Sequence, residues 1–213
     1  MKGSNDKRQE LLDTALKTLD SGLNRGSSGN ISVREGDGFL ITPSALPFNE
    51  CSPDDMVKVA MDGSWQGQHK PSSEWRFHRD IYQHRREAGA IIHAHPVWCT
   101  TLACLNKGIP AVHYMIAMAG GNTIRCAPYA LFGSQQLSDL ALEALQGRKA
   151  CLLANHGLLC FESTLKKALA LAEEVELLAQ IYCQTLQTGQ PVILNDEAMH
   201  EVIERFAGYK PDD

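Results

Sequence analysis

The feature of this sequence that most limits its fold is a succession of short β-prone segments that outnumber the helices available to connect them. Residues 31–34 and 39–42 flank a glycine-rich turn at 36–38, and residues 151–154 and 158–161 flank a second short turn. Strands joined by short turns pair antiparallel, whereas parallel neighbours need a long crossover, usually a helix. The pattern therefore predicts a three-layered α/β architecture, with a central, mostly antiparallel sheet flanked by helices.

The other segments divide into strands and helices by the period of their apolar residues. Further strands are predicted at 56–61, 89–95, 110–114 and 123–127, and helices at 6–21, 74–86, 96–106, 134–146 and 164–188. The last helix carries a long apolar stripe that ends before Gly189, a common residue after a helix. Because no repeat, low-complexity tract or linker interrupts the pattern, residues 1–213 are predicted to form one domain.

Composition excludes several classes of protein. The chain has 213 residues, of which 44% are hydrophobic, and a formal net charge of -5, which gives no general attraction for nucleic acid or an anionic membrane. No apolar run approaches the roughly 18 to 20 residues that cross a bilayer, and the N-terminus does not resemble a signal peptide. We therefore expect a cytoplasmic protein with neither a nucleic-acid nor a membrane partner. The seven cysteines are not spaced C-x-x-C, so no thiolate zinc site is expected.

Two histidines in one predicted strand give the strongest local signal of chemistry. His93 and His95 are alternate residues of a β-branched segment, so their imidazoles point to the same side. Alone, the pair fits a metal site, a polar sheet face or a pH-sensitive pair. His156, at the turn between two apolar strands, offers a third ligand, with Gly157 to relieve the backbone. Three histidines that leave one coordination position open are typical of catalytic zinc.

A carboxylate and three turns suggest an anion site. Glu74 follows Pro71-Ser72-Ser73, so it is predicted in the first turn of a helix capped by Ser72 or Ser73. The placement fits simple helix-dipole stabilisation, and it also fits an acid/base beside an anion at the helix N-terminus. The turns 28–30 and 42–45 add hydroxyls and a glycine. Because the sequence has no nucleotide-binding fingerprint, a small phosphorylated metabolite is the expected ligand.

The remaining titratable candidates are ambiguous. Tyr114 is surrounded by apolar residues, which fits a core tyrosine or a proton donor in a dry site. The other histidines are predicted to be surface or packed residues, and they are His69, His78, His84, His113 and His200.

Taken in order, these segments resemble the class II aldolase/adducin family over essentially the whole chain. The resemblance is carried by Gly29-Asn30-Ile31-Ser32, Ile41-Thr42-Pro43-Ser44, Lys70-Pro71-Ser72-Ser73-Glu74, His93-Ala94-His95, His113-Tyr114-Met115-Ile116 and Asn155-His156-Gly157. It extends through residues 73–78 and 119–122. The ordered set is far more specific than any one of its parts.

The resemblance implies a zinc enzyme of the class II aldolase fold. It would cleave a ketose 1-phosphate, either L-fuculose 1-phosphate or a similar 5-deoxy- or 5-methylthio-pentulose 1-phosphate, between C3 and C4. The products would be dihydroxyacetone phosphate and a small aldehyde, which is lactaldehyde, acetaldehyde or methylthioacetaldehyde.

The resemblance also assigns residues. It implies one Zn²⁺ per subunit, held by His93, His95 and His156, with Glu74 as a ligand of the empty site and as the acid/base when substrate is bound. That task favours a Glu74 pKa moved toward neutrality. The implied phosphate residues are Gly29, Asn30, Ser44, Ala45, Ser72 and Ser73.

Members of the family form fourfold-symmetric homotetramers with active sites between adjacent subunits, which implies that Tyr114 and Tyr209 reach a neighbour's metal. Two residues depart from the family pattern: Ala45 stands where glycine is usual, and Asn155 stands where histidine or glutamine is common. The alternatives on the same scaffold are a ribulose-phosphate 4-epimerase, a methylthioribulose-1-phosphate dehydratase and a non-catalytic adducin-like module.

Overall fold

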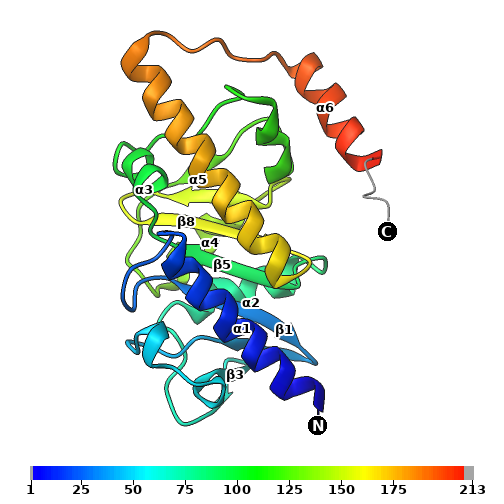
Figure 1. Cartoon of the computed structure of the whole chain (residues 1–213). Helices are drawn as coiled ribbons and strands as arrows, with labels where there is room; N and C mark the ends of the chain where they lie inside the picture. Colours follow the sequence, from blue (N-terminus) through cyan, green and yellow to red (C-terminus); the bar gives the residue numbers. More distant parts are fainter. Residues whose placement is uncertain (1, 209–213) are drawn as a thin grey trace.

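An eight-stranded sheet runs through the structure, a computed structural model that describes residues 2–208 (Figure 1). The strands are β1 (Asn30–Glu35), β2 (Gly38–Ile41), β3 (Val57–Ala60), β4 (Trp65–Gln66), β5 (Ala90–Ala94), β6 (Arg125–Ala127), β7 (Ala150–Leu153) and β8 (Gly157–Glu162). Their order is β4-β3-β2-β1-β5-β8-β7-β6, and all neighbours pair antiparallel except β6 and β7. The prediction of a mostly antiparallel sheet is confirmed.

Helices cover both faces of the sheet, so the fold has three layers as predicted. One face carries α1 (Lys2–Asp20), α3 (Val97–Cys104) and α5 (Leu165–Thr188), and the opposite face carries α2 (Trp75–His84) and α4 (Gln135–Ala144) (Figure 1). Side chains of β5 alternate between the two layers, because Ile92 packs into the cluster under α1, α3 and α5 while Ile91 packs into the cluster under α2 and α4. His93 follows this alternation and contacts Phe77 of α2.

Two parts of the chain differ from the predicted elements. The strand expected at 110–114 is wrong: Ile109 forms only an isolated bridge with Ile124, and Tyr114–Ala119 forms a 3-10 helix, η3. Pro110 lacks a backbone N–H, and the His113 ring accepts a hydrogen bond from Met115 N at the start of η3, so a turn replaces the strand.

The elements missed by the sequence prediction are short or lie at the chain end. They are β4, the 3-10 helices η1 (Phe48–Glu50) and η2 (Pro53–Asp55), and α6 (Asp196–Gly208). α6 stands at the end of an extended connection after α5 and packs against η3, where Phe206 lies beside Tyr114 (Figure 1).

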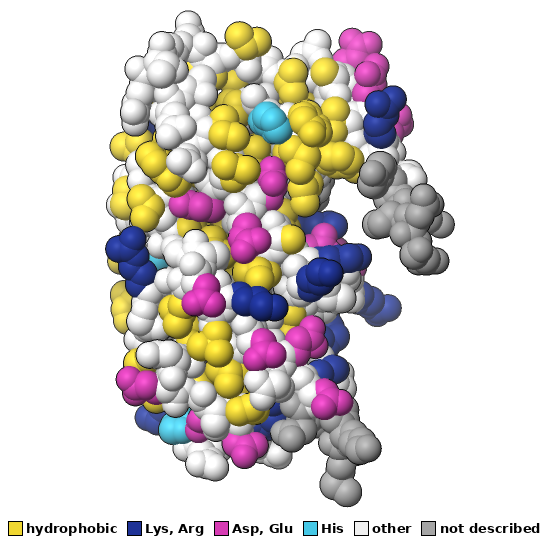
Figure 2. All heavy atoms as spheres, in the orientation of Figure 1, with side chains coloured by type: hydrophobic (Ala, Val, Ile, Leu, Met, Phe, Trp, Pro, Cys, Tyr) yellow, Lys and Arg dark blue, Asp and Glu magenta, His cyan; other side chains and the backbone are white. Residues whose placement is uncertain are grey.

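Figure 2 shows acidic and basic side chains interspersed on the face that carries α1 and α5, with hydrophobic side chains gathered beside α6. Among the residues described, no helix combines the length and the apolar character that a membrane crossing requires.

A carboxylate from α5 holds the start of α3, directly after the histidine strand. Glu176 accepts hydrogen bonds from the backbone N–H groups of Trp98 and Cys99, each at 2.8 Å. These are two of the N–H groups that have no partner within the helix, so Glu176 satisfies them and fixes where the chain turns after His95.

We expect Glu176→Ala to lower the free energy of unfolding by about 2 kcal/mol, because two charge-assisted hydrogen bonds are lost together. Thermal and urea unfolding at one protein concentration measure the change. Glu173→Ala, which alters an exposed carboxylate on the same helix, is the matched control and should change stability little. Equal effects of the two substitutions would contradict a capping role for Glu176.

Candidate active site

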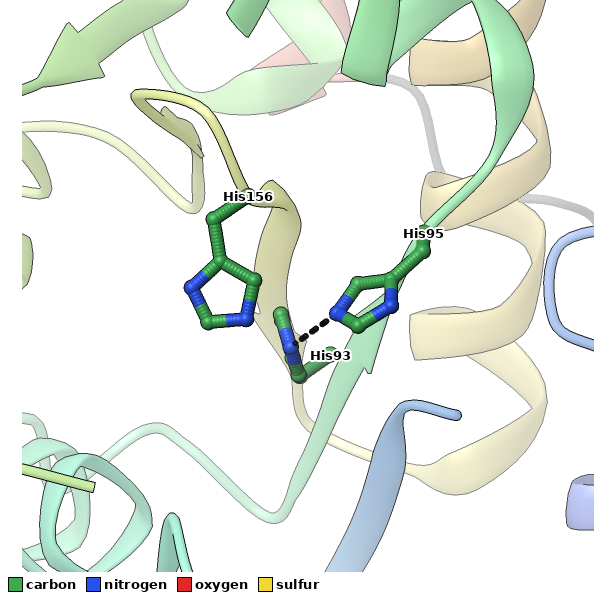
Figure 3. A group of neighbouring side chains, drawn as sticks. All are labelled: His93, His95 and His156. Atoms are coloured by element: carbon green, nitrogen blue, oxygen red, sulfur yellow. Dashed lines mark hydrogen bonds between the residues drawn. The ribbon is translucent and has the colours of Figure 1, made fainter. Parts of the chain in front are cut away.

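Three histidines converge at the end of β5 (Figure 3). His93 belongs to β5, His95 follows the end of that strand, and His156 lies in the turn between β7 and β8. The Nε2 atoms of His93 and His95 are 2.9 Å apart, and one ring nitrogen from each of the three residues lies within 4.8 Å of the others. The structure thus brings together all three histidines that the sequence suggested as ligands.

The turn that carries His156 depends on two unusual backbone positions. Asn155 adopts a positive φ of 54°, a conformation that asparagine tolerates better than most residues. Gly157 does not supply the left-handed conformation; it allows close approach instead. A Cβ atom at Gly157 would lie 2.4 Å from the carbonyl oxygen of Ala94 and 2.8 Å from the His95 ring. A larger residue there would push His156 away from the other two histidines.

Hydrogen bonds position the first two histidines. His93 Nδ1 donates to the carbonyl oxygen of Leu158 at 2.8 Å, which turns Nε2 toward the cluster. The backbone N–H of His95 donates to Asn24 Oδ1 at 3.2 Å. Gly29 makes room for this contact, since a Cβ there would lie 2.3 Å from Asn24 Oδ1.

Glu74 faces the histidines from α2. The helix begins one residue later than predicted, so Glu74 itself is the N-cap residue, and its backbone N–H donates to Ser72 Oγ at 3.3 Å. Its side chain turns inward instead of capping the helix. Glu74 Oε2 lies 3.2 Å from His93 Nε2 and accepts from Asn30 Nδ2 at 2.9 Å. Glu74 Oε1 lies 3.5 Å from His156 Nε2 and is buried, with no hydrogen-bond partner among the described residues.

The surroundings of Glu74, His95 and His156 lower the pKa values of all three side chains. Burial raises the pKa of the Glu74 carboxyl, but His93, His156 and Asn30 together outweigh burial and hold the pKa well below its usual range. A pKa moved toward neutrality was expected, and this arrangement moves it the other way. Burial and the neighbouring His93 lower the pKa of His95 to about 3 and that of His156 to about 4. Both imidazoles are therefore neutral at pH 7, the form that binds a cation.

The donor set fits a divalent cation. Ring nitrogens of the three histidines converge, and a buried carboxylate oxygen beside them has no hydrogen-bond partner among the described residues. Three imidazoles with a carboxylate are ligands suited to zinc and similar divalent ions.

A cavity of about 350 Å³ opens beside the cluster. Its lining includes Glu74, His95 and His156, together with all six residues predicted to bind phosphate: Gly29, Asn30, Ser44, Ala45, Ser72 and Ser73. His93 lies at the base of the cluster, fully buried. Residues from six separate parts of the sequence thus form one hydroxyl-rich cavity, and two of the three imidazoles line it.

Two predicted residues are not placed in this cavity. Tyr114 lies in η3, is 48% exposed and contacts His113 and Phe206, so it does not line the cavity of its own chain. Tyr209 lies outside the described residues.

The sequence prediction missed Tyr129 and Phe132, which line the cavity and are more than half exposed. Their only signal is a pair of aromatic residues in a loop between Pro128 and Gly133.

Comparison with known proteins identifies the family to which the chain belongs. The sequence profile described as "Class II Aldolase and Adducin N-terminal domain" matches residues 9–183. The chain belongs to the class II aldolase/adducin family. The resemblance predicted from the sequence is therefore confirmed, and so is the fold.

Individual members of the class II aldolase/adducin family are similar over nearly the whole chain. The 5-methylthioribulose-1-phosphate/5-deoxyribulose-1-phosphate aldolase of Rhodospirillum rubrum is 52% identical, covering 95% of this chain and 91% of that protein. The L-fuculose phosphate aldolase of Escherichia coli K12 is 48% identical, covering 94% of each. A solved structure of an L-fuculose 1-phosphate aldolase superposes with a TM-score of 0.92 at 42% identity, covering 95% of this chain and 96% of the other.

The departure at Ala45 has a structural consequence. Ala45 has a φ of 58°, in the left-handed region that favours glycine. In that region the Cβ atom crowds the backbone, which costs about 1–2 kcal/mol. The loop that lines the cavity therefore carries strain that a glycine would not.

We expect Ala45→Gly to raise the free energy of unfolding by about 1 kcal/mol, because relief of this strain exceeds the entropy gained by the unfolded chain. Ala170→Gly is the matched control: the same change in the exposed face of α5 should lower stability by about 1 kcal/mol. Urea unfolding of both variants gives the comparison, and a loss of stability in both would contradict strain at position 45.

Proposed function

We propose that this protein is a zinc-dependent aldolase, with one Zn²⁺ per subunit, that cleaves a ketose 1-phosphate between C3 and C4. The products are dihydroxyacetone phosphate and a small aldehyde. The observation that carries the proposal is the position of Glu74: its unpartnered Oε1 faces three convergent imidazoles and lines the same cavity as the serine-bearing turns. A proton-transferring group, a cation site and an anion site thus meet in one cavity.

The hydroxyl-rich end of the cavity would bind the phosphate. Ser44, Ser72 and Ser73 come from two adjacent turns, held together by the hydrogen bond from Ser44 N to the Lys70 carbonyl and by that from Ser72 N to the Thr42 carbonyl. Gly29, Asn30 and Ala45 complete this end. Hydroxyl and backbone N–H groups bind phosphate oxygens without adding a charged side chain.

The bond between C3 and C4 would break at the other end of the cavity, beside the histidines. His93, His95 and His156 would hold a Zn²⁺ ion, which would supply positive charge to stabilise negative charge on the substrate oxygens. As the bond between C3 and C4 breaks, the C4 hydroxyl would lose its proton to become the aldehyde carbonyl, and Glu74 Oε1, having taken up a proton, would deliver one to C3.

The aldehyde end would involve an adjacent subunit of a homotetramer. Tyr114 is exposed and lies away from the cavity of its own chain, which is the position required of a residue that reaches a neighbouring site. We propose that it exchanges the proton on the C4 oxygen, and that Tyr209 assists it. Exposed hydrophobic side chains support association, among them Val97, Leu105, Val192 and Ile193.

The proposed substrate is a class of compounds, the ketose 1-phosphates. The similar proteins named above act on 5-methylthioribulose 1-phosphate, 5-deoxyribulose 1-phosphate or L-fuculose phosphate. These ketoses share the phosphate-bearing end and differ at the carbons that become the aldehyde. The part of the site that takes these carbons must therefore make the distinction.

Release of dihydroxyacetone phosphate from the three ketose 1-phosphates tests the proposal. We expect release from at least one of them, loss of release after treatment with a chelator, and recovery when Zn²⁺ is restored. The ranking of kcat/KM among the three identifies the preferred aldehyde. Absence of release from all three with zinc-loaded protein would overturn the proposed reaction, and release that survives complete removal of metal would overturn the role of zinc.

We expect Glu74→Gln to lower kcat by at least about 100-fold while zinc content and melting temperature stay close to wild type, because an amide cannot carry the proton. Metal analysis and steady-state kinetics measure the two effects. Glu87→Gln alters an exposed carboxylate and is the matched control. An unchanged kcat in Glu74→Gln would remove Glu74 from its proposed role.

A further inference from the structure

A buried line of five polar side chains ends on Glu74. It runs from Tyr82 Oη to Ser32 Oγ (2.9 Å), from Ser32 Oγ to His78 Nδ1 (2.7 Å), from His78 Nε2 to Asn30 Oδ1 (2.6 Å) and from Asn30 Nδ2 to Glu74 Oε2 (2.9 Å). The side chains come from β1 and α2, so the line connects the sheet to the helix that carries Glu74.

The donor at each link follows from the carboxylate. An ionised carboxylate only accepts hydrogen bonds, so Asn30 must donate through Nδ2 and present Oδ1 to His78. Oδ1 is an acceptor, so the His78 ring must carry its proton on Nε2, which leaves Nδ1 to accept from the Ser32 hydroxyl. Ser32 Oγ then accepts from the Tyr82 hydroxyl. Every hydrogen bond in the line therefore points toward Glu74.

Burial prevents water from replacing any member of this line. His78 and Ser32 are fully buried, and Tyr82 and Asn30 are 2% and 4% exposed. Burial, assisted by the charge of His93, lowers the pKa of His78 to about 3, and burial raises the pKa of Tyr82. Both rings are thus neutral at pH 7. The His78 ring is also stacked against Phe77 and Phe39, which fix its plane.

We propose that His78 is a positioning residue for Glu74 in the proposed aldolase reaction: its Nε2–H fixes the Asn30 amide, which holds Glu74 Oε2 and leaves Oε1 free for proton transfer. Without this donor the Asn30 amide can rotate and present its oxygen to the carboxylate. Two acceptors would then face each other, and Glu74 would lose the contact that distinguishes its two oxygens.

Two amide substitutions at position 78 separate positioning from packing. His78→Gln places an N–H donor near the position of Nε2, whereas His78→Asn is one methylene shorter and reaches only toward Ser32. Both bury the same polar group. We expect His78→Asn to lower kcat about 10- to 100-fold with KM within about threefold of wild type, the range found when partners of active-site ligands are removed. His78→Gln should recover kcat to within about fivefold. His84→Asn, on the exposed end of the same helix, is the control and should leave kcat unchanged.

The protonation of the ring gives a second readout that does not depend on activity. ¹⁵N NMR of histidine-labelled wild-type protein should show His78 as a neutral ring protonated on Nε2. A ring protonated on Nδ1, or on both nitrogens, would overturn the proposal even if neither variant folds.

The outcomes distinguish this inference from the function on which it rests. If wild-type protein releases no dihydroxyacetone phosphate, the proposed function fails and the role of His78 fails with it. If wild-type protein is active and His78→Asn matches it in kcat, only the role of His78 is overturned. Equal losses in His78→Asn and His78→Gln would also overturn it, because the two share the burial cost and differ in their reach to Asn30.

Discussion

The pairing of β5 with its two neighbours is the constraint on which the site depends. β5 lies between β1 and β8, with Asn30 opposite His93 on one side and Leu159 opposite His93 on the other. One register therefore sets the distance from His93 to Asn30, and through Asn30 to Glu74. The register between β5 and β8 places the carbonyl of Leu158 where the His93 ring donates a hydrogen bond to it. A shift by one residue would turn His93 toward the opposite layer and separate it from all of these partners.

The same register explains how a carboxylate is kept in the interior. Glu74 is 6% exposed, and an isolated buried charge would be strongly destabilising. One oxygen accepts a hydrogen bond from Asn30 and lies 3.2 Å from Nε2 of His93, which is opposite Asn30 in the β1–β5 pair, and the other oxygen has no hydrogen-bond partner among the described residues. The fold thus satisfies half of the carboxylate and leaves the reactive half unsatisfied. Such incomplete satisfaction is typical of functional sites and is supported by the rigid elements around them.

Local patterns predicted the parts of the site, and long-range contacts supplied the rest. Alternation along a strand was sufficient to place His93 and His95 together. The turn between two apolar strands was sufficient to indicate His156 as a third candidate ligand. The position of His78 beside Asn30 was not predictable, because the two residues are 48 positions apart and nothing in either segment marks the hydrogen bond. The conformation of the His156 turn was also misjudged: Asn155 adopts the positive φ, and Gly157 is needed for close approach to Ala94.

The charge of the cavity links its two ends. Among the described residues that line it, none is lysine or arginine, Glu74 carries a negative charge, and His95 and His156 are neutral at pH 7. A phosphorylated ligand would therefore meet a negative site in a chain whose net charge is already -5. A divalent cation among the imidazoles reverses the sign of the cavity, and the attraction between opposite charges is strong at short range in a poorly solvated site. In the proposed reaction, cation binding and phosphate binding would then be coupled, and the serine-lined turns would need only to orient the phosphate.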